Sequence, residues 1–225
     1  MACTYAHNVN ESMGLSLQLA NIESFFSSEE ANDHELTARE LEQSKTFGDK
    51  RLSEFRIGRR CAREALRKFG IADTEIPIGE GRQPVWPEGY CGSISHSSGL
   101  AGAMLSRKEH HLSIGLDIER RRSVDETLWD HLFTERDKTL LKALGPDPEE
   151  WATLFFSLKE SFYKLQYPLT GRFLDFPEVC LAPHGDGYIA LWEEGIDLPD
   201  LLRRHRMGYR FTEDHVVTYA LLEYT

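Results

Sequence analysis

Four charged side chains, at two places in the sequence, have the types and spacing to act on a phosphate group. Asp117 and Glu119 lie in the stretch Ile114–Glu119, where apolar and acidic residues alternate. Alternation with a period of two predicts a half-buried strand, with both carboxylates on one face about 6–7 Å apart. Two carboxylates so close repel each other unless a cation neutralises them, and Mg²⁺ binds oxygen ligands of this kind. A solvated edge strand with acidic side chains is the alternative.

The other two charged side chains, Glu160 and Lys164, lie in a predicted helix over residues 150–167. Its apolar residues follow the i, i+3, i+4, i+7 pattern of a buried face. They are Trp151, Leu154, Phe155, Leu158, Phe162 and Leu165. Glu160 and Lys164 are spaced i, i+4 and share a different face, with Lys159 beside them. This spacing is also typical of a plain surface ion pair.

A second predicted helix, over residues 50–69, supplies positive charge. An apolar stripe predicts its buried face, and Gly70 suits the position just after its end. The arginines outside the stripe are Arg51, Arg56, Arg59, Arg60, Arg63 and Arg67. Their planar side chains bind phosphate in bidentate fashion, so their excess indicates an anion site. The alternative is a solvated face partly neutralised by Glu54 and Glu64.

Two further segments could contact an anion. Residues 79–87 form a proline-rich loop that could hold Arg82 in place, and residues 92–99 begin as a strand around Ser95, His96 and Ser97. Hydroxyls with a protonatable histidine favour a phosphate cradle. A serine hydrolase using Ser95 or Ser97 with His96 is an alternative, but the G-x-S-x-G motif is absent. Residues 100–105 and 114–119 are predicted to pair as a hairpin.

Composition limits the class of protein. The net charge of −11 argues against non-specific binding to nucleic acid or to an anionic membrane. The four cysteines are scattered with no C-x-x-C, so neither a disulfide framework nor a zinc site is indicated. We find no signal peptide and no apolar run of membrane-spanning length, and we expect a cytoplasmic protein.

The motifs, taken in order, resemble those of the 4′-phosphopantetheinyl transferases. The two hallmarks of that family are G-x-D-x-E at Gly115–Glu119 and [WF]-x-x-K-E-x-x-x-K at Phe156–Lys164. The upstream Ser-His pair and the Arg-x-Pro-x-Trp-Pro loop agree with it. The resemblance covers roughly residues 45–180 and is greatest to the group that serves siderophore and other non-ribosomal peptide synthetases.

The resemblance implies a pseudo-twofold α+β fold of two similar lobes, each with a small sheet packed against helices. We expect residues 1–120 to form the N-terminal lobe, with the nucleotide-binding elements and the acidic strand. Residues 121–225 would form the C-terminal lobe, with the Lys-Glu helix. The implied reaction moves 4′-phosphopantetheine from coenzyme A to a serine hydroxyl of an apo carrier protein and releases 3′,5′-ADP.

The resemblance also implies roles for single residues. Asp117, Glu119 and Glu160 would hold Mg²⁺, and Glu160 would take the serine proton directly or through a water. Lys164 would neutralise the diphosphate. The residues that would bind the nucleotide are Arg51, Arg59, Arg82, Ser95, His96 and Lys159. These residues and Lys164 would form the coenzyme A site. The catalytic candidates are Glu160, Lys164, Asp117 and His96.

The implied partner is an acyl, peptidyl or aryl carrier protein, and the implied state is a monomer. Such carriers are acidic around the target serine, so we expect a local basic or apolar patch to dock them. Arg120–Arg122 and Arg203–Arg206 are candidates for that patch. A non-catalytic module that binds coenzyme A or another nucleotide on the same fold is the alternative function.

Overall fold

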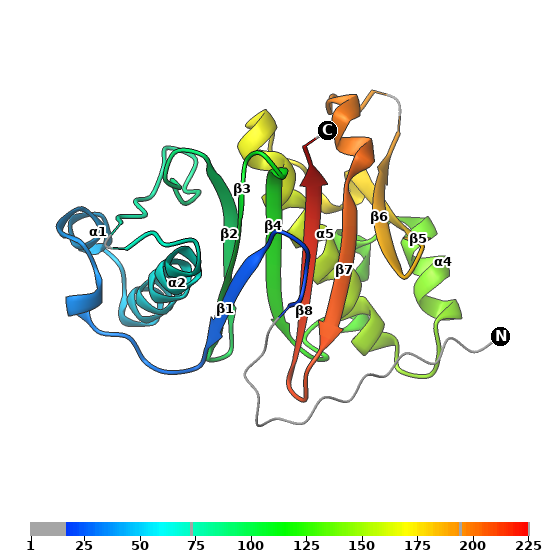
Figure 1. The fold of residues 1–225 in the computed structure, drawn as a ribbon. Helices are drawn as coiled ribbons and strands as arrows, with labels where there is room; N and C mark the ends of the chain where they lie inside the picture. Colours follow the sequence, from blue (N-terminus) through cyan, green and yellow to red (C-terminus); the bar gives the residue numbers. More distant parts are fainter. Residues whose placement is uncertain (1–16, 73, 194, 225) are drawn as a thin grey trace.

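The chain forms two antiparallel sheets, each with a long helix on one face (Figure 1). The computed structural model describes residues 17–72, 74–193 and 195–224. The smaller sheet has the order β1-β3-β2 and consists of Glu23–Ser27 (β1), Leu100–Arg107 (β3) and Tyr90–Ser97 (β2). The larger sheet has the order β4-β8-β7-β6-β5 and consists of His111–Arg120 (β4), His215–Glu223 (β8), Arg206–Phe211 (β7), Gly187–Trp192 (β6) and Val179–His184 (β5). The α+β fold class predicted from the sequence is confirmed.

Five α-helices and four short 3-10 helices complete the described part of the chain. The α-helices are Ala38–Ser44 (α1), Asp49–Lys68 (α2), Trp129–Leu132 (α3), Glu135–Ala143 (α4) and Pro148–Thr170 (α5). Short 3-10 helices are Asp33–Glu35 (η1), Glu126–Leu128 (η2), Phe176–Glu178 (η3) and Asp200–Arg204 (η4). Helix α2 packs on the smaller sheet and α5 on the larger one, so a long helix on a small antiparallel sheet occurs twice.

Helix α2 begins and ends where the sequence predicts. Its apolar face, which includes Cys61, Ala62 and Leu66, is fully buried against the smaller sheet. The helix stops because Gly70 adopts a left-handed φ of 80°, a conformation that costs glycine little. The basic residues Arg67 and Lys68 occupy the last turn, where the helix dipole favours positive charge.

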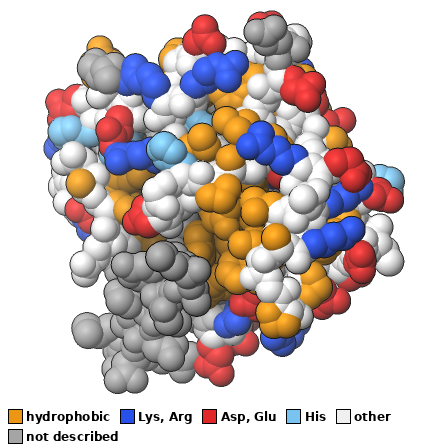
Figure 2. All heavy atoms as spheres, turned by 90° about the vertical axis from the view of Figure 1, so that its right-hand side faces the viewer, with side chains coloured by type: hydrophobic (Ala, Val, Ile, Leu, Met, Phe, Trp, Pro, Cys, Tyr) orange, Lys and Arg blue, Asp and Glu red, His pale blue; other side chains and the backbone are white. Residues whose placement is uncertain are grey.

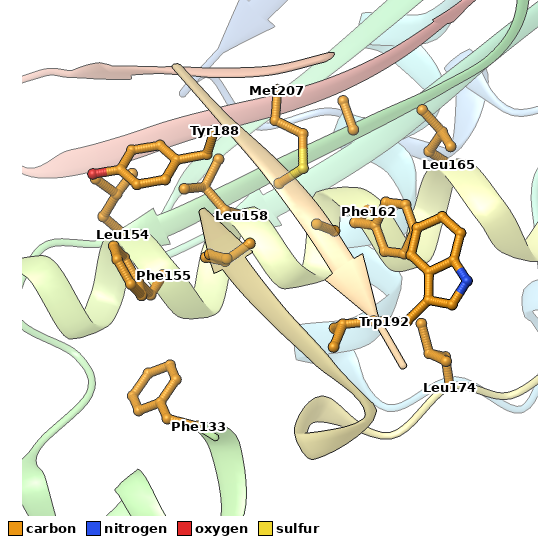
Figure 3. Close-up of a cluster of buried hydrophobic side chains, with 14 of the residues drawn as sticks. Phe133, Leu154, Phe155, Leu158, Phe162, Leu165, Leu174, Tyr188, Trp192 and Met207 are labelled. Carbon is orange, nitrogen blue, oxygen red and sulfur yellow. The ribbon is translucent and has the colours of Figure 1, made fainter. Parts of the chain in front are cut away.

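Helix α5 carries the core of the larger lobe. Leu154, Phe155, Leu158, Phe162 and Leu165 are completely buried, which confirms the predicted apolar face. Figure 3 shows these side chains pointing toward Tyr188, Trp192 and Met207 of the larger sheet. Asp147 caps the start of the helix by accepting a hydrogen bond from the backbone N–H of Glu150.

Strand β4 lies at the boundary between the two sheets, and its position corrects the predicted hairpin of residues 100–105 and 114–119. Strand β3 pairs with β1 and β2, whereas β4 pairs with β8, where Asp117 lies opposite Thr218. A tight turn at Ser98 and Gly99, both with positive φ, joins β2 to β3 instead. Alternating polarity predicts a strand but does not select its partner.

The free edge of β4 lies against β2 through side chains. Ser93, Ser95 and Ser97, which we call the serine row, alternate along one face of β2. Ser93 donates to the carbonyl of Leu116, and the hydroxyl of Ser95 accepts from the N–H of Ile118. The hydroxyls therefore satisfy part of the β4 backbone where no strand pairs with it.

No helix within the described ranges is both long and apolar enough to cross a membrane.

Candidate active site

Asp117 is the centre of a buried polar network between β4, β2 and α5. The residue is 3% exposed, which excludes the alternative of a solvated edge strand. Oδ1 accepts from the hydroxyl of Ser95 at 3.1 Å and from the ammonium of Lys164 at 2.7 Å. Oδ2 accepts from the hydroxyl of Ser157 at 2.8 Å. Donors from two different elements therefore fix both carboxylate oxygens.

Gly115 allows α5 to come close enough for this network. A Cβ at position 115 would lie 1.8 Å from the carbonyl oxygen of Ser161, so only glycine fits there. The strand and the helix thus touch backbone to backbone, and Ser157, one turn before Ser161, reaches Asp117. Close packing of β4 on α5 therefore explains why the first position of the G-x-D-x-E motif is glycine.

Glu119 and Glu160 share the electrostatic environment of Asp117 and Lys164. Burial, with the nearby charge of Asp117, raises the pKa of Glu119 to about 7. Burial also raises the pKa of Glu160, against the opposing effect of Lys164. Burial disfavours the ammonium of Lys164, but the charges of Asp117, Glu160 and Glu119 outweigh it and raise the pKa. Three carboxylates thus surround one lysine.

The donor set suits a divalent cation, although no cage for one is ready. Oxygen ligands with an excess of negative charge over a single ammonium are what Mg²⁺ prefers. Within the ranges that the structure describes, however, no three His, Cys, Asp or Glu side chains are arranged to hold a metal ion. The ammonium of Lys164 already lies 2.7 Å from Oδ1 of Asp117, one of the two oxygens that this carboxylate could offer to such an ion.

His96 extends the charged cluster toward α2. Its Nδ1 lies 3.7 Å from Oε1 of Glu54, which in turn lies 4.0 Å from the ammonium of Lys50. Burial lowers the pKa of His96; Glu54 opposes this effect and Lys164 adds to it. Arg51 lies one turn before Phe55 on α2, exposed, with its guanidinium 4.4 Å from the ring centroid of Phe47. Two of the predicted anion ligands, His96 and Arg51, therefore lie near the first turns of α2.

Arg59 is held more tightly by the protein than the sequence predicts. It is 6% exposed, and its Nε donates to the carbonyl of Ile76 at 2.6 Å. Its guanidinium lies 4.3 Å from the ring centroid of Phe55, and burial lowers its pKa to about 10. This arginine fixes the segment that leads into the 79–87 loop.

The 79–87 loop is confirmed as a loop, and it touches the other lobe. The bridge between Ile78 and Pro84 closes it, and Arg82 is exposed with a left-handed φ of 67°. A Cβ at Gly81 would lie 2.6 Å from the hydroxyl of Tyr167 on α5, so the loop packs closely on that helix. Arg82 thus projects from a loop that contacts both lobes.

Lys159 lies next to Glu160, but its ammonium is held within the protein. Its ammonium is buried in an ion pair with Asp137 at 2.8 Å. It also donates to the carbonyls of Leu132 and Phe176. Lys159 precedes Lys164 by five residues, so the two side chains point about 140° apart around the helix axis. The partners of Lys159 therefore lie on the side of α5 away from β4. The ion pair gives Lys159 a structural role, its side chain also lines a small cavity beside Glu160, and its contact with the nucleotide stays a prediction.

The serine row contacts two carboxylates of the site. The hydroxyl of Ser95 donates to Asp117 and that of Ser97 to Glu119, and the phosphate contact expected of Ser95 stays a prediction. His96 is on the opposite face of β2 and contacts Glu54. The serine–histidine pair required by the hydrolase alternative is therefore not formed.

A small cavity adjoins Glu160. Its lining is mostly apolar and comes from α5, from residues 173–176 and from β5. The residues that line it are Lys159, Glu160, Tyr163, Phe173, Leu174, Asp175, Phe176 and Val179. An uncharged chain could enter it beside the carboxylate.

Ser157 and Glu54 are site residues that the sequence did not identify. Ser157 precedes Glu160 by three residues, so helical spacing alone could have placed it near the same face. The sequence contains no comparable signal for Glu54, because its contact with His96 depends on how α2 packs on β2.

With this geometry established, the chain can be placed among known proteins. Residues 39–106 match the family model described as the 4′-phosphopantetheinyl transferase N-terminal domain. Residues 113–220 match the model of the 4′-phosphopantetheinyl transferase superfamily. The two matches include β4, α5 and the whole charged cluster. The chain belongs to the 4′-phosphopantetheinyl transferase superfamily.

Three relatives illustrate the similarity. The 4′-phosphopantetheinyl transferase Svp of Streptomyces mobaraensis is 37% identical over 140 residues, 61% of this chain and 56% of that protein. The 4′-phosphopantetheinyl transferase PptT of Mycobacterium tuberculosis is 33% identical over 133 residues, 59% of each chain. Enterobactin synthase component D of Escherichia coli is 40% identical over 132 residues, 57% of this chain and 62% of that protein. The matches thus span little more than half of each relative.

Solved structures of holo-[acyl-carrier-protein] synthases are also similar. The one from Thermotoga maritima has a TM-score of 0.40 at 18% identity, over 50% of this chain and 63% of that one. The one from Bacillus anthracis, in complex with CoA (3′,5′-ADP), has a TM-score of 0.39 at 17% identity, over 52% of this chain and 99% of that one.

Proposed function

We propose that this protein transfers 4′-phosphopantetheine from coenzyme A to a serine hydroxyl of an apo carrier protein, with Mg²⁺, and releases 3′,5′-ADP. The observation that carries the proposal is Lys164 among Asp117, Glu119 and Glu160, at the contact between β4 and α5. Membership of the transferase superfamily and the names of the relatives support the same reaction.

The proposed step is a displacement at phosphorus. The serine oxygen bonds to the phosphorus that bears pantetheine, the bond from that phosphorus to the bridging oxygen breaks, and 3′,5′-ADP leaves with the electron pair. Glu160 takes the serine proton, directly or through a water. Lys164 offsets charge on the diphosphate. Mg²⁺, when bound through Asp117, Glu119 and Glu160, would supply further charge neutralisation.

Binding of coenzyme A is assigned to both lobes. We assign binding of the 3′-phosphate and the nucleotide to His96, Arg51 and Arg82. Arg59 would contribute the N–H groups of its guanidinium other than Nε, which donates to the carbonyl of Ile76. The pantetheine arm, which carries no charge, is assigned to the cavity beside Glu160. In this scheme residues 1–120 supply the nucleotide contacts and residues 121–225 supply α5.

The carrier protein must dock without a large basic surface. In the first candidate run, Arg121 forms an ion pair with Glu150 and Arg122 with Asp147. In the second run, Arg206 forms an ion pair with Glu223. Figure 2 shows basic and acidic side chains side by side around an apolar area on one face. Since these arginines already have carboxylate partners, we assign docking mainly to apolar contacts. We further propose a cytoplasmic, monomeric enzyme.

The test is incubation of apo carrier proteins with coenzyme A and Mg²⁺, followed by mass spectrometry of the carrier. We expect a gain of one phosphopantetheine group that is lost with EDTA and lost in Asp117→Ala and Glu160→Ala. Carriers from siderophore and other non-ribosomal peptide synthetases are the first choice, given the similarity to enterobactin synthase component D.

The competing function is a non-catalytic module that binds coenzyme A. It would show coenzyme A binding that EDTA does not change, with no mass gain on any of several carriers. That pair of results would overturn the proposed transferase activity.

A further inference from the structure

Lys164 and Asp117 form the closest charge contact of the candidate site, at 2.7 Å between Nζ and Oδ1. The same ammonium donates to the hydroxyl of Ser95 at 3.1 Å. Lys164 thus bridges α5 to both β4 and β2, at the carboxylate to which the proposed function assigns a divalent ion.

The carboxylate of Asp117 has little capacity for another cation while Lys164 is there. Oδ1 already accepts two donors and Oδ2 accepts Ser157, and the group is 3% exposed. A Mg²⁺ ion binds carboxylate oxygen at about 2.0–2.1 Å. An ammonium and a dication on one buried oxygen would repel each other strongly, because little water screens them.

We propose that the ammonium of Lys164 is a resident cation of this site and that it competes with a divalent ion for Asp117. The ion binds as Lys164 leaves the carboxylate, so the two events are coupled. Of the two partners Lys164 is the one nearer to solvent, because its side chain is 28% exposed, whereas that of Asp117 is 4% exposed. This inference rests on the proposed function only for the identity of the ion.

Coupling of this kind has a consequence for the order of events. An ion that displaces Lys164 releases its positive charge from Asp117, and the ammonium becomes available to a diphosphate in the same site. The divalent ion and the ammonium of Lys164 would then both be available to offset the charge of the diphosphate. Before the exchange, the ammonium of Lys164 is paired with Asp117. The exchange keeps the buried carboxylate neutralised throughout, which avoids the cost of an unpaired buried charge.

The test measures binding of Mn²⁺, a paramagnetic substitute for Mg²⁺, to the full chain without coenzyme A or carrier. We expect Lys164→Met to bind Mn²⁺ on the order of tenfold more tightly than the unaltered protein, because a competing charged hydrogen bond is gone. The gain should disappear in the double variant Lys164→Met with Asp117→Asn. Lys142→Met is the matched control, since Lys142 is exposed on α4 and its loss changes the net charge equally.

A second measurement uses the unaltered protein and does not depend on folding of the variants. Amine-reactive labelling of Lys164, read by peptide mass spectrometry, should rise severalfold with saturating Mg²⁺. Labelling of Lys159, which is paired with Asp137, should stay constant. Equal Mn²⁺ affinity in Lys164→Met and the unaltered protein, or labelling that Mg²⁺ does not change, would overturn the proposal. Neither readout involves transfer to a carrier, so failure here and failure of the proposed activity are distinct.

Discussion

The hydroxyl of Ser157 on α5 donates to Oδ2 of Asp117 on β4 at 2.8 Å, on the carboxylate oxygen opposite to Lys164. The hydrogen bond orients Asp117 from the helix that also carries Glu160. Ser157→Ala should leave a buried carboxylate oxygen without this donor and destabilise the protein by about 1–3 kcal/mol. We expect transfer activity to fall on the order of tenfold, as one lost hydrogen bond in a preorganised site allows.

Ser161→Ala is the matched control for that variant. Ser161 is also a buried hydroxyl of α5, but it bonds to Thr218 and to the backbone of Ser157 rather than to Asp117. Its loss should lower the unfolding temperature while leaving the rate of the folded enzyme near that of the unaltered protein. Equal rates for Ser157→Ala and Ser161→Ala would contradict a special role for Ser157.

The contact between Gly115 and Ser161 predicts a strong steric effect. Gly115→Ala would place a methyl group 1.8 Å from a backbone oxygen, so β4 and α5 must separate. We expect a loss of roughly 3 kcal/mol or more in the free energy of unfolding, at the upper end of overpacking effects. Gly48→Ala, where a Cβ meets nothing within 4 Å, should cost less than about 1 kcal/mol. Urea unfolding of both variants gives the comparison.

The buried pair of Lys159 and Asp137 predicts a loss of stability without loss of nucleotide binding. Lys159→Met leaves the carboxylate of Asp137 buried and without its cation, at a cost of roughly 3–5 kcal/mol. Arg39→Met removes an exposed partner of Glu75 and should cost under about 1 kcal/mol. The affinity of folded Lys159→Met for 3′,5′-ADP should equal that of the unaltered protein. Weaker binding, measured by calorimetry below the unfolding temperature, would return Lys159 to the nucleotide site.

His205 predicts how stability changes with pH. The ring is 2% exposed, accepts from the N–H of Ala190 and packs on Phe162, and burial lowers its pKa to about 4. Between that value and about 6.5 the unfolded chain binds a proton that the folded protein does not. The contribution of neutral His205 to the free energy of unfolding is therefore complete above about pH 6.5. It is lost as the pH falls toward 4, by about 3 kcal/mol in total.

The measurement is urea unfolding at several pH values between 4 and 7. In His205→Gln the free energy of unfolding should fall less over this range than in the unaltered protein, whatever the absolute stability of the variant. An equal pH dependence in the two proteins would show that His205 is not the responsible group.

The sequence predicted most of the helices and strands. Periodicity located α5, α2 and the strand with Asp117 because burial of one face leaves a repeat in the local sequence. It could not predict that β4 pairs with β8 from the end of the chain rather than with β3. The choice of partner depends on packing between segments more than ninety residues apart, and nothing in the residues of β4 encodes it.

The same limit applies within the candidate site. Lys159 and Lys164 are both helical lysines near Glu160, and the sequence gives them similar roles. The structure separates them by direction, since one faces Asp137 and the other Asp117. Ser95 shows a related ambiguity, because a small hydroxyl suggests a ligand contact and is equally suited to hydrogen bonding with a neighbouring strand.

The serine row has a consequence for how this architecture can vary. On one side β4 is joined to β8 by main-chain hydrogen bonds, which every amino acid supplies. On the other side it is joined to β2 by hydroxyls, which only particular amino acids supply. The polar part of the junction between the two sheets therefore depends on the amino acids at three positions of β2.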